Sequence, residues 1–254
     1  VILGSRRSNH VTPFRQGPAA RPLATPAARA AQQATSTIPI VMGNADDDPV
    51  RQGLIASLAR PGGNVTGIIS MASDLAGKRL ELLKETIPSL SRVAILWDPR
   101  GPGGAGHARE SEDIAPRLGL QLQRLEIRRR DDLDLAFQSA RKQRAEALVV
   151  VTTTIINSYL PEILTFAANN RLPAIYSNSR PVDEGGLMSY ADDPIARIRR
   201  AAEFVDKILK GRKPADLPVE RPIKFEFIVN LKAAKQIGLT IPPNVLVRAD
   251  RVIR

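Results

Sequence analysis

The residues from 92 to 177 alternate short apolar runs with stretches of helical periodicity, and this pattern limits the fold more than any other feature of the chain. The clearest run, RVAILW at 92–97, has no polar alternation, which is typical of a parallel strand buried on both faces. The other elements expected in this segment are strands at 120–126, 147–151 and 173–177 and helices near 107–118, 132–143 and 158–170. The order predicts a parallel, doubly wound α/β sheet with right-handed crossovers.

A second informative segment runs from Ile38 to Gly67. Its apolar start, Ile38–Met42, indicates a buried strand. Three aspartates (Asp46, Asp47 and Asp48) before Pro49 then precede apolar residues at helical spacing, so we expect a helix over 50–59. A polar loop between a strand end and a helix start is where open α/β sheets bind small ligands. The remaining expected elements are strands near 65–69 and 187–190 and helices at 25–34, 74–86 and 194–210.

The composition excludes several functional classes. With 254 residues the chain can bury a sizeable core in one large or two small domains. The absence of cysteine rules out disulfides and thiolate chemistry. The longest apolar runs are far shorter than the ~20 residues that a membrane-crossing helix needs, so no such helix is expected.

The formal net charge of +11 suggests nucleic-acid binding at first sight. Five arginines in residues 1–37, a segment without Asp, Glu or Lys, supply nearly half of it. The cluster Arg128-Arg129-Arg130 is followed at once by Asp131, Asp132 and Asp134, and no nucleic-acid motif or interleaved aromatic residues are present. We therefore expect solvated charged helix faces and no nucleic-acid partner.

No arrangement of catalytic or metal-binding residues stands out. The two histidines, His10 and His107, lie in polar or glycine-rich surroundings without a Ser/His/Asp or Cys/His arrangement. The aspartates at 46–48 precede an expected helix, where carboxylates serve as caps or ligand-loop groups. No catalytic residue, metal site or cofactor is therefore expected.

One glycine-rich loop fits a nucleotide-binding pattern. Gly101–Gly106 (GPGGAG) matches GxGxxG, and Glu126 lies 20 residues beyond Gly106 at the end of the next strand. However, Asp98-Pro99-Arg100 separates the strand from the first glycine, whereas the pattern needs a tight turn at the strand end. We favour a flexible loop at the rim of the sheet, with dinucleotide binding by an NAD-type oxidoreductase as the alternative.

Four longer stretches resemble a known family. They are TPAARAAQQATSTIPIVMGNADDDPVRQGLIASLARPGGNVTG at 25–67, ELLKETIPSLSRVAILWDP at 81–99, RLPAIYSNSRPVDEGGLMSYADD at 171–193 and AAEFVDKILKGRKPADLPVERPIKFEFIVNLKAAKQIGLTIPPNVLVRADRVI at 201–253. Together they closely resemble the substrate-binding proteins of a bacterial ABC importer family, described as tryptophan/tyrosine-type. The resemblance implies a two-lobed type I periplasmic-binding fold with parallel doubly wound sheets, a periplasmic location, and binding of an amino acid or similar molecule without chemical change.

The resemblance also implies how the chain is divided. The expected first lobe comprises 25–90 and 192–222, and the expected second lobe comprises 91–191 and 223–254. Residues 1–24 read as an irregular leader that does not match the family and lacks the apolar core of a signal peptide. Compared with the family, the first lobe lacks its leading strands, so we expect an N-terminally truncated chain with an incomplete first lobe.

Ligand groups are implied at strand ends that face each other across a cleft between the lobes. The candidates are Thr25, Asn44, Asp46 and Thr66 in the first lobe, Thr153, Thr154, Tyr176 and Ser177 in the second, and Ser189 and Tyr190 at the crossing. An aspartate suits a ligand ammonium group, and hydroxyls or backbone N–H groups at helix starts suit a carboxylate. Thr25, Asp46 and Thr154 are equally well explained as helix caps, and Tyr176 as a packing residue.

The implied partners are a small ligand and an ABC permease at the membrane, and the expected state is a monomer. Three alternatives remain at this stage. They are an NAD-type enzyme that uses Gly101–Gly106, a cytosolic ligand-sensing module of the same fold, and a truncated product that binds nothing.

Overall fold

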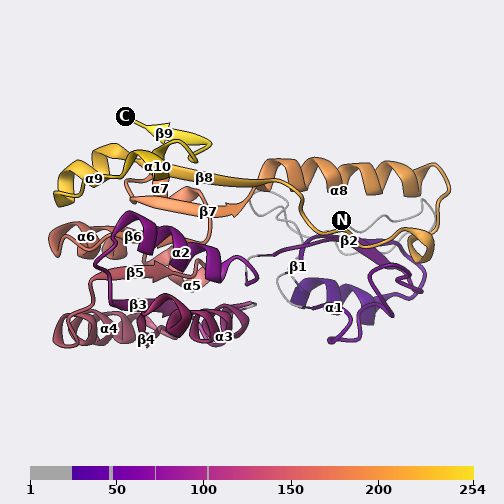
Figure 1. The fold of residues 1–254 in the computed structure, drawn as a ribbon. Coiled ribbons are helices and arrows are strands. Elements are labelled where there is room, and N and C mark those ends of the chain that lie inside the picture. The colour runs from indigo at the N-terminus through magenta and orange to yellow at the C-terminus, as the bar shows by residue number, and fades with distance from the viewer. Residues whose placement is uncertain (1–24, 46–47, 72, 102) are drawn as a thin grey trace. The chain divides into compact units, whose positions relative to one another are not determined.

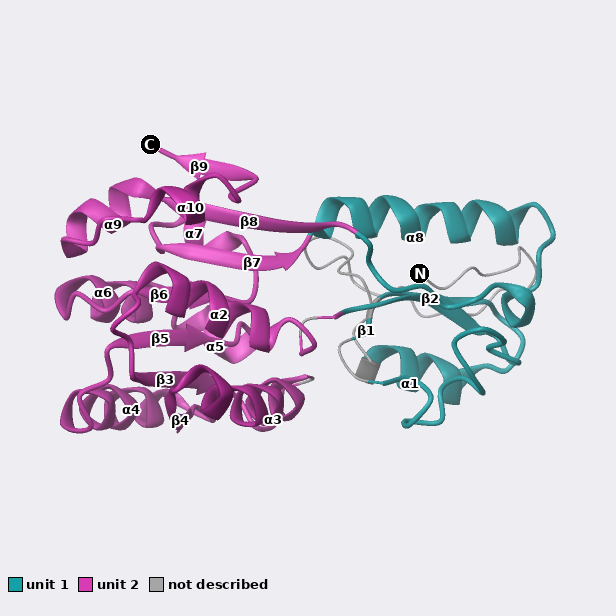
Figure 2. Ribbon diagram, in the orientation of Figure 1, with its two compact units in different colours: residues 1–70, 193–223 teal, residues 71–192, 224–254 magenta. Residues whose placement is uncertain are grey.

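The computed structural model describes residues 25–45, 48–71, 73–101 and 103–254. The chain forms two compact units (Figures 1 and 2). Unit 1 takes the chain up to Ser70 together with Asp193–Ile223, and unit 2 takes Met71–Asp192 and Lys224–Arg254. Each unit therefore combines two separate stretches of sequence. None of the described helices has the length and apolar composition that crossing a membrane requires.

The sheet of unit 2 has seven strands among the described residues, in the order β4-β3-β5-β6-β7-β8-β9. They are β3 (Arg92–Trp97), β4 (Gln121–Glu126), β5 (Ala147–Val150), β6 (Ala174–Tyr176), β7 (Met188–Asp192), β8 (Phe225–Asn230) and β9 (Arg251–Ile253). The neighbours from β4 to β7 pair in parallel, β8 is antiparallel to β7, and β9 is parallel to β8. The predicted alternation of strands and helices thus produces a mostly parallel sheet.

Helices cover both faces of this sheet (Figure 1). One layer contains α2 (Ala76–Thr86), α3 (Gly104–Ile114), the 3₁₀ turn η1 (Ala115–Leu118), α9 (Leu231–Ile237) and α10 (Pro243–Leu246). The other contains α4 (Arg130–Lys142), α5 (Thr154–Ser158), α6 (Leu160–Asn169) and α7 (Arg180–Asp183). Ile95 packs with the first layer and its neighbours Ala94 and Leu96 pack with the second. This double burial explains why every residue from Val93 to Trp97 is apolar.

Unit 1 has two parallel strands among its described residues, β1 (Ile40–Ala45) and β2 (Val65–Ile69). On one face α1 (Thr25–Ala34) packs against Ile40 and Met42, and on the other α8 (Pro194–Leu209) packs against Val41. The Asp193 side chain begins α8 by accepting hydrogen bonds from the backbone N–H groups two and three residues further on, at 2.9 and 3.0 Å. The short 3₁₀ turn η2 (Pro214–Asp216) follows α8.

The return segment after η2 closes unit 1 along β2. The Glu220 N–H donates to the Gly67 carbonyl at 2.9 Å, and the Glu220 carbonyl accepts from the Ile69 N–H at 3.0 Å. Gly67 has φ +130°, and a Cβ at this position would lie 2.1 Å from the Met42 carbonyl oxygen. Only glycine therefore fits at this point of the paired strands.

The prediction of a helix over 50–59 is wrong. The described chain forms a series of turns and bends there instead. Gly53 adopts φ +69°, in the left-handed region, and the Asp48 carboxylate accepts the Val50 N–H at 2.9 Å in a local turn. Leu54 and Ile55 are nevertheless buried, so the apolar spacing reflects packing within turns and not a helical face.

The first division between the units also differs from the one expected near residue 90. The structure divides the chain after Ser70, after Asp192 and after Ile223. Helix α2 belongs to unit 2 because Leu80, Leu82 and Leu83 lie in the same buried cluster as β3. The segment 71–90 therefore packs with the strand that follows it and not with the strands that precede it.

Candidate functional site

Three neighbouring parallel strands of unit 2 end at one edge of the sheet, and polar residues follow each of them. Asp98 follows β3, Thr152 and Thr153 follow the end of β5 by two and three residues, and Ser177 follows β6. Carboxyl ends of parallel strands meet at one edge of the sheet, so these residues form a single polar edge. We refer to Asp98, Thr152, Thr153, Ser177 and Asn178 as the polar edge.

A hydrogen-bond network joins the middle of the polar edge. The Ser177 hydroxyl accepts the Thr152 N–H at 2.8 Å, and the two hydroxyl oxygens lie 2.5 Å apart. The Asn178 side-chain NH₂ donates to Thr152 Oγ1 at 2.8 Å, whereas its carbonyl oxygen Oδ1 is buried without a hydrogen-bond partner among the described residues. A buried acceptor in this state is costly unless a ligand or water supplies a donor.

Asp98 joins the polar edge to the glycine-rich loop. This buried carboxylate accepts the Arg100 N–H at 3.0 Å, and the Asp98 carbonyl accepts the Gly101 N–H at 3.1 Å. A Cβ on Gly104 would lie 2.3 Å from the Asp98 carbonyl oxygen, and one on Gly101 would lie 2.8 Å from Thr153 Cγ2. The glycines thus allow close packing of the loop on the polar edge.

The acidic residue of the nucleotide-binding pattern has local partners. Glu126 ends β4, at the edge of the sheet, and forms ion pairs with Arg128 at 2.6 Å and Arg124 at 3.6 Å. In a dinucleotide site this carboxylate would instead receive the ribose hydroxyls. Among the described residues, no group of three His, Cys, Asp or Glu is arranged to hold a metal ion.

Thr153 and Thr154 stand at the start of α5. The Thr153 hydroxyl accepts the Ile156 N–H at 3.4 Å, as a helix cap does, and its side chain is half-buried. Thr154 is the first residue of the helix and is exposed. The hydroxyl proton of Thr153 stays available for a ligand oxygen, because a cap uses only the oxygen as an acceptor.

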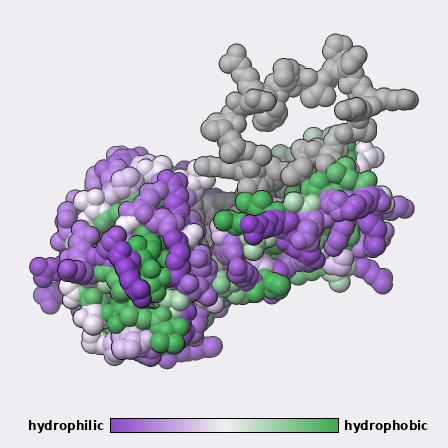
Figure 3. Space-filling model, turned by 90° about the horizontal axis from the view of Figure 1, so that it is seen from above, coloured by the Kyte–Doolittle hydropathy of each residue, from purple (hydrophilic) through white to green (hydrophobic). Residues whose placement is uncertain are grey.

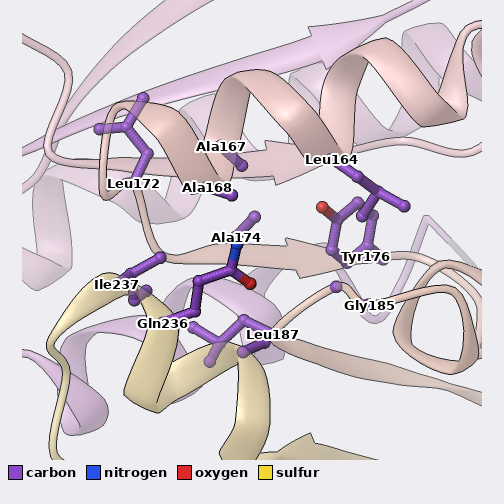
Figure 4. A pocket seen from close by; sticks show the side chains of 12 residues that line it. Leu164, Ala167, Ala168, Leu172, Ala174, Tyr176, Gly185, Leu187, Gln236 and Ile237 are labelled. Carbon is purple, nitrogen blue, oxygen red and sulfur yellow. The ribbon is translucent and has the colours of Figure 1, made fainter.

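Tyr176 is buried in the interior of unit 2. Figure 4 shows its ring beside a small cavity between α6, β6 and α9, among Leu164, Ala167 and Gly185. The cavity measures about 20 Å³, and a Cβ on Gly186 would lie 2.6 Å from the Tyr176 ring. Burial raises the pKa of the Tyr176 phenol far above its ordinary value. This side chain therefore serves packing on the α6 face.

The two residues predicted at the crossing lie in β7. Ser189 is fully buried, and its hydroxyl has no partner among the described residues. Tyr190 is half-buried, with its ring centre 6.1 Å from that of Phe225 and 6.4 Å from that of Phe227 in β8. Tyr190 thus belongs to an aromatic group that spans β7 and β8.

The remaining predicted residues belong to unit 1. Thr66 is fully buried in β2 of unit 1, where its hydroxyl donates to the Leu217 carbonyl at 2.7 Å. Thr25 begins α1 and Asn44 lies in β1, but their side chains are outside the description. Asp46 lies outside the described residues.

Sequence reasoning missed a buried basic pair in unit 2. Arg79 and His107 are both buried and in contact, and Arg79 Nε donates to the Tyr190 carbonyl at 2.8 Å. Burial lowers the pKa of Arg79 to about 9, and burial together with the Arg79 charge holds the pKa of His107 well below its ordinary value. Arg79 precedes Leu82 and Leu83 by three and four residues, so helical spacing already placed it on the inward face of α2.

Most of the chain matches one protein family. Residues 20–253 match the sequence model of the ABC transporter substrate binding protein family. The chain belongs to this family. The resemblance seen in the sequence is thereby confirmed, and the family is one of solute-binding proteins rather than enzymes.

Relatives of this ABC substrate-binding protein include a tyrosine-binding protein from Clostridioides difficile (strain R20291). It is 29% identical over 217 residues, which are 85% of this chain and 62% of the relative, so the chain spans less than two thirds of that relative's length. A crystal structure of an ABC domain in complex with L-Trp from Streptococcus pneumonia has a TM-score of 0.79 and 27% identity, covering 91% of this chain and 77% of that one. A conserved domain protein from Vibrio cholerae has a TM-score of 0.80 and 27% identity, covering 90% and 76%.

These structural neighbours bear on the fold predicted for the ABC substrate-binding protein. Their similarity extends over nine tenths of the chain, which includes described parts of both units. The predicted α/β class and its periplasmic-binding-protein fold are therefore confirmed.

Proposed function

We propose that this ABC substrate-binding protein is the solute-binding component of an importer. It holds an amino acid in a cleft between its two lobes, without chemical change, and delivers it to a membrane permease from the periplasmic side. The observation that carries the proposal is the polar edge, which follows three parallel strands in a chain whose relatives include a tyrosine-binding protein and a structure in complex with L-Trp.

The chemistry of the polar edge suits a zwitterion. The buried Asn178 Oδ1 and the Asp98 carboxylate are acceptors for a ligand ammonium group. The hydroxyls of Thr153 and Ser177 are donors for a carboxylate. Supporting the charged ends of an amino acid in this way needs no catalytic group, in keeping with a family of solute-binding proteins.

We leave Thr66, Tyr176 and Ser189 out of the proposed ligand groups, because their side chains are buried inside the fold. The proposed ligand groups are Thr153, Thr154, Ser177 and Tyr190 from the earlier candidates, Thr152, Asn178 and Asp98 from the polar edge, and Thr25, Asn44 and Asp46 from unit 1.

Calorimetric titration of the purified chain with L-Trp, L-Tyr, L-Leu and NADH tests the proposal. We expect saturable binding of an amino acid and none of NADH. Asn178→Ala removes the buried, unpaired acceptor and Ser177→Ala removes the hydroxyl that orients Thr152, so each should weaken binding by about tenfold.

Ser158→Ala is the matched control. Ser158 is an exposed serine in α5, and its hydroxyl donates to the Ile155 carbonyl of the same helix, so its removal should leave affinity unchanged. A folded chain that binds none of the amino acids would reject the importer proposal. Saturable binding of NADH that is lost on changing the glycine-rich loop would favour the dinucleotide alternative instead.

A further inference from the structure

One flank of α8 carries a largely exposed apolar seam beside the face that packs on the sheet of unit 1. The seam consists of Ile195, Ile198, Ala202, Val205 and Leu209, spaced alternately by three and four residues. Ile195, Ile198 and Leu209 are 59%, 51% and 70% exposed, Ala202 is exposed, and Val205 is half-buried. A 3-4 spacing of apolar residues is the pattern by which two helices pack side by side.

The seam borders the face that holds α8 in the fold and shares Val205 with it. Phe204 is the buried residue of the helix, and it packs with Ala201, Val205 and Ile208 against β1, β2 and Leu217. Figure 3 shows hydrophobic residues in green among hydrophilic ones in purple on the side of the molecule that is uppermost in Figure 1. Large apolar side chains gathered on an exposed helix flank are typical of an interaction surface.

Two charges beside the seam make it complementary to itself. Arg199 and Asp206 are both exposed and both follow a seam residue by one position. When two copies of α8 run antiparallel with Ala202 opposite Ala202, Ile195 lies opposite Leu209 and Ile198 opposite Val205. In the same register Arg199 of each copy lies opposite Asp206 of the other. Two reciprocal ion pairs form when Asp206 exchanges its exposed partner in the same helix, Lys210 at 2.8 Å, for Arg199 of the second copy.

We propose that α8 pairs antiparallel with α8 of a second copy of this chain, with the two-fold axis at Ala202. The self-complementary seam and the reciprocal charges select a second copy as the occupant. A pair of 16-residue helices is a small contact, in the class below about 1,200 Å² that gives weak, concentration-dependent association. This departs from the monomer expected from the sequence.

Single cysteines test the register directly, because the natural chain has none. Ala202→Cys places two thiols at the two-fold axis, and mild oxidation should produce a covalent dimer. Ile195→Cys is the matched control on the same seam, because antiparallel pairing separates its two copies by about 21 Å. Cross-linking at position 202 but not at 195 supports the proposal. Cross-linking at both positions or at neither overturns it.

A charge exchange tests the reciprocal pairs by sedimentation over a range of protein concentration. Arg199→Glu and Asp206→Arg should each weaken self-association by about tenfold, because attraction becomes repulsion at two contacts per dimer. An equimolar mixture of the two variants should regain association, since every contact in the mixed dimer is then attractive. Failure of the mixture to regain it would overturn the register.

A last variant pair separates the seam from general surface hydrophobicity. Ile198→Glu should abolish the dimer, whereas Ile223→Glu, at an apolar residue that is 96% exposed and lies off the seam, should leave it unchanged. Circular dichroism checks that both variants fold. A chain that stays monomeric at every concentration, and whose Ala202→Cys variant does not cross-link, would overturn the proposal. The seam would then not bind a second copy of α8.

Discussion

The two units use the same kind of parallel strand but surround it differently. Ile95 of unit 2 lies in a strand with neighbours on both edges and helices on both faces. Ile40 of unit 1 is equally buried, but its strand has one described neighbour, β2, with α1 and α8 across the faces. Full burial of a side chain therefore does not measure how firmly its surroundings hold it.

The charged contacts of the two units differ in how far they are exposed to solvent. In unit 1 the partly exposed Arg200 binds Glu220 through two hydrogen bonds of 2.6 Å, which joins α8 to the return segment. In unit 2 Arg79 and His107 are enclosed within the fold. Exposed pairs respond weakly to mutation, whereas buried titratable groups respond strongly to pH.

The largest expected effect is the loss of unit 1 alone. Gly67→Ala would place a methyl group 2.1 Å from the Met42 carbonyl oxygen in a backbone conformation that alanine rarely adopts. We expect a cost of about 5 kcal/mol from the clash and the strain together. Circular dichroism should show the loss of unit 1 on urea unfolding. Fluorescence of Trp97, the sole tryptophan, reports on unit 2 and should keep its transition.

Gly63→Ala is the control for this change, because nothing lies within 4 Å of a Cβ there. It should leave both transitions in place. If the Trp97 transition moved together with the circular dichroism signal in Gly67→Ala, the units would unfold as one and the contrast between them would fail.

A matched pair of cavity mutations measures the contrast itself. Ile95→Ala should destabilise unit 2 by about 4 kcal/mol, because the surrounding strands and helices cannot collapse into the space. Ile40→Ala should cost unit 1 about 2 kcal/mol, since its smaller layers can relax. Urea midpoints with unchanged slopes would give both values. Equal costs would show that the two cores are equally rigid.

Lowering the pH should reduce the stability of unit 2 through His107. The pKa of this histidine in the folded chain lies well below 6.5, so below about pH 6.5 the unfolded chain takes up a proton that the folded chain does not. Stability should therefore fall with decreasing pH by up to about 1.4 kcal/mol per unit. His107→Gln should remove this slope between about pH 6.5 and 5.

Ser111→Ala, one turn further along α3 at a fully buried serine, is the control without a titrating group. It should retain the slope of the natural chain. An unchanged slope in His107→Gln would show that other groups bind the protons.

The smallest effect is expected at the exposed pair of unit 1. Side chains of Arg200 and Glu220 are 40% and 35% exposed, so a double-mutant cycle with Arg200→Met and Glu220→Gln should give a coupling of about 0.5–1 kcal/mol. Arg200 lowers the pKa of Glu220, so this coupling is present above about pH 4.5 and is lost as the pH falls through the folded pKa. A coupling that persisted at acid pH would contradict this origin.

Unit 2 could be predicted well because burial on both faces leaves a simple pattern. The strand at 92–97 was predicted with the bounds that the structure gives it, since every residue between its ends packs in one of two layers. The turns over 50–59 could not be predicted, because Leu54 and Ile55 reproduce helical spacing while Gly53 bends the chain. The spacing of apolar residues indicates which residues are buried. It indicates a helix only where no residue such as Gly53 bends the backbone within the pattern.

The candidate site divides in a similar way. Ser177 and Thr153 could be predicted because they follow strands. Thr152 and Asn178 were missed because only the turn geometry decides which neighbouring side chains meet. The role of Thr66 depends on the Leu217 carbonyl, 151 residues further along the chain, and local sequence carries no trace of that contact.

The interleaving of the two units has a consequence for synthesis on the ribosome. β7 is made before β8, and the chain must return through Asp193–Ile223 before Phe225 can pair along Asp192. Throughout that interval the nascent sheet presents an open edge of backbone N–H and C=O groups. Translation speed over residues 193–223 therefore sets how long chaperones must shield the growing chain from other strands.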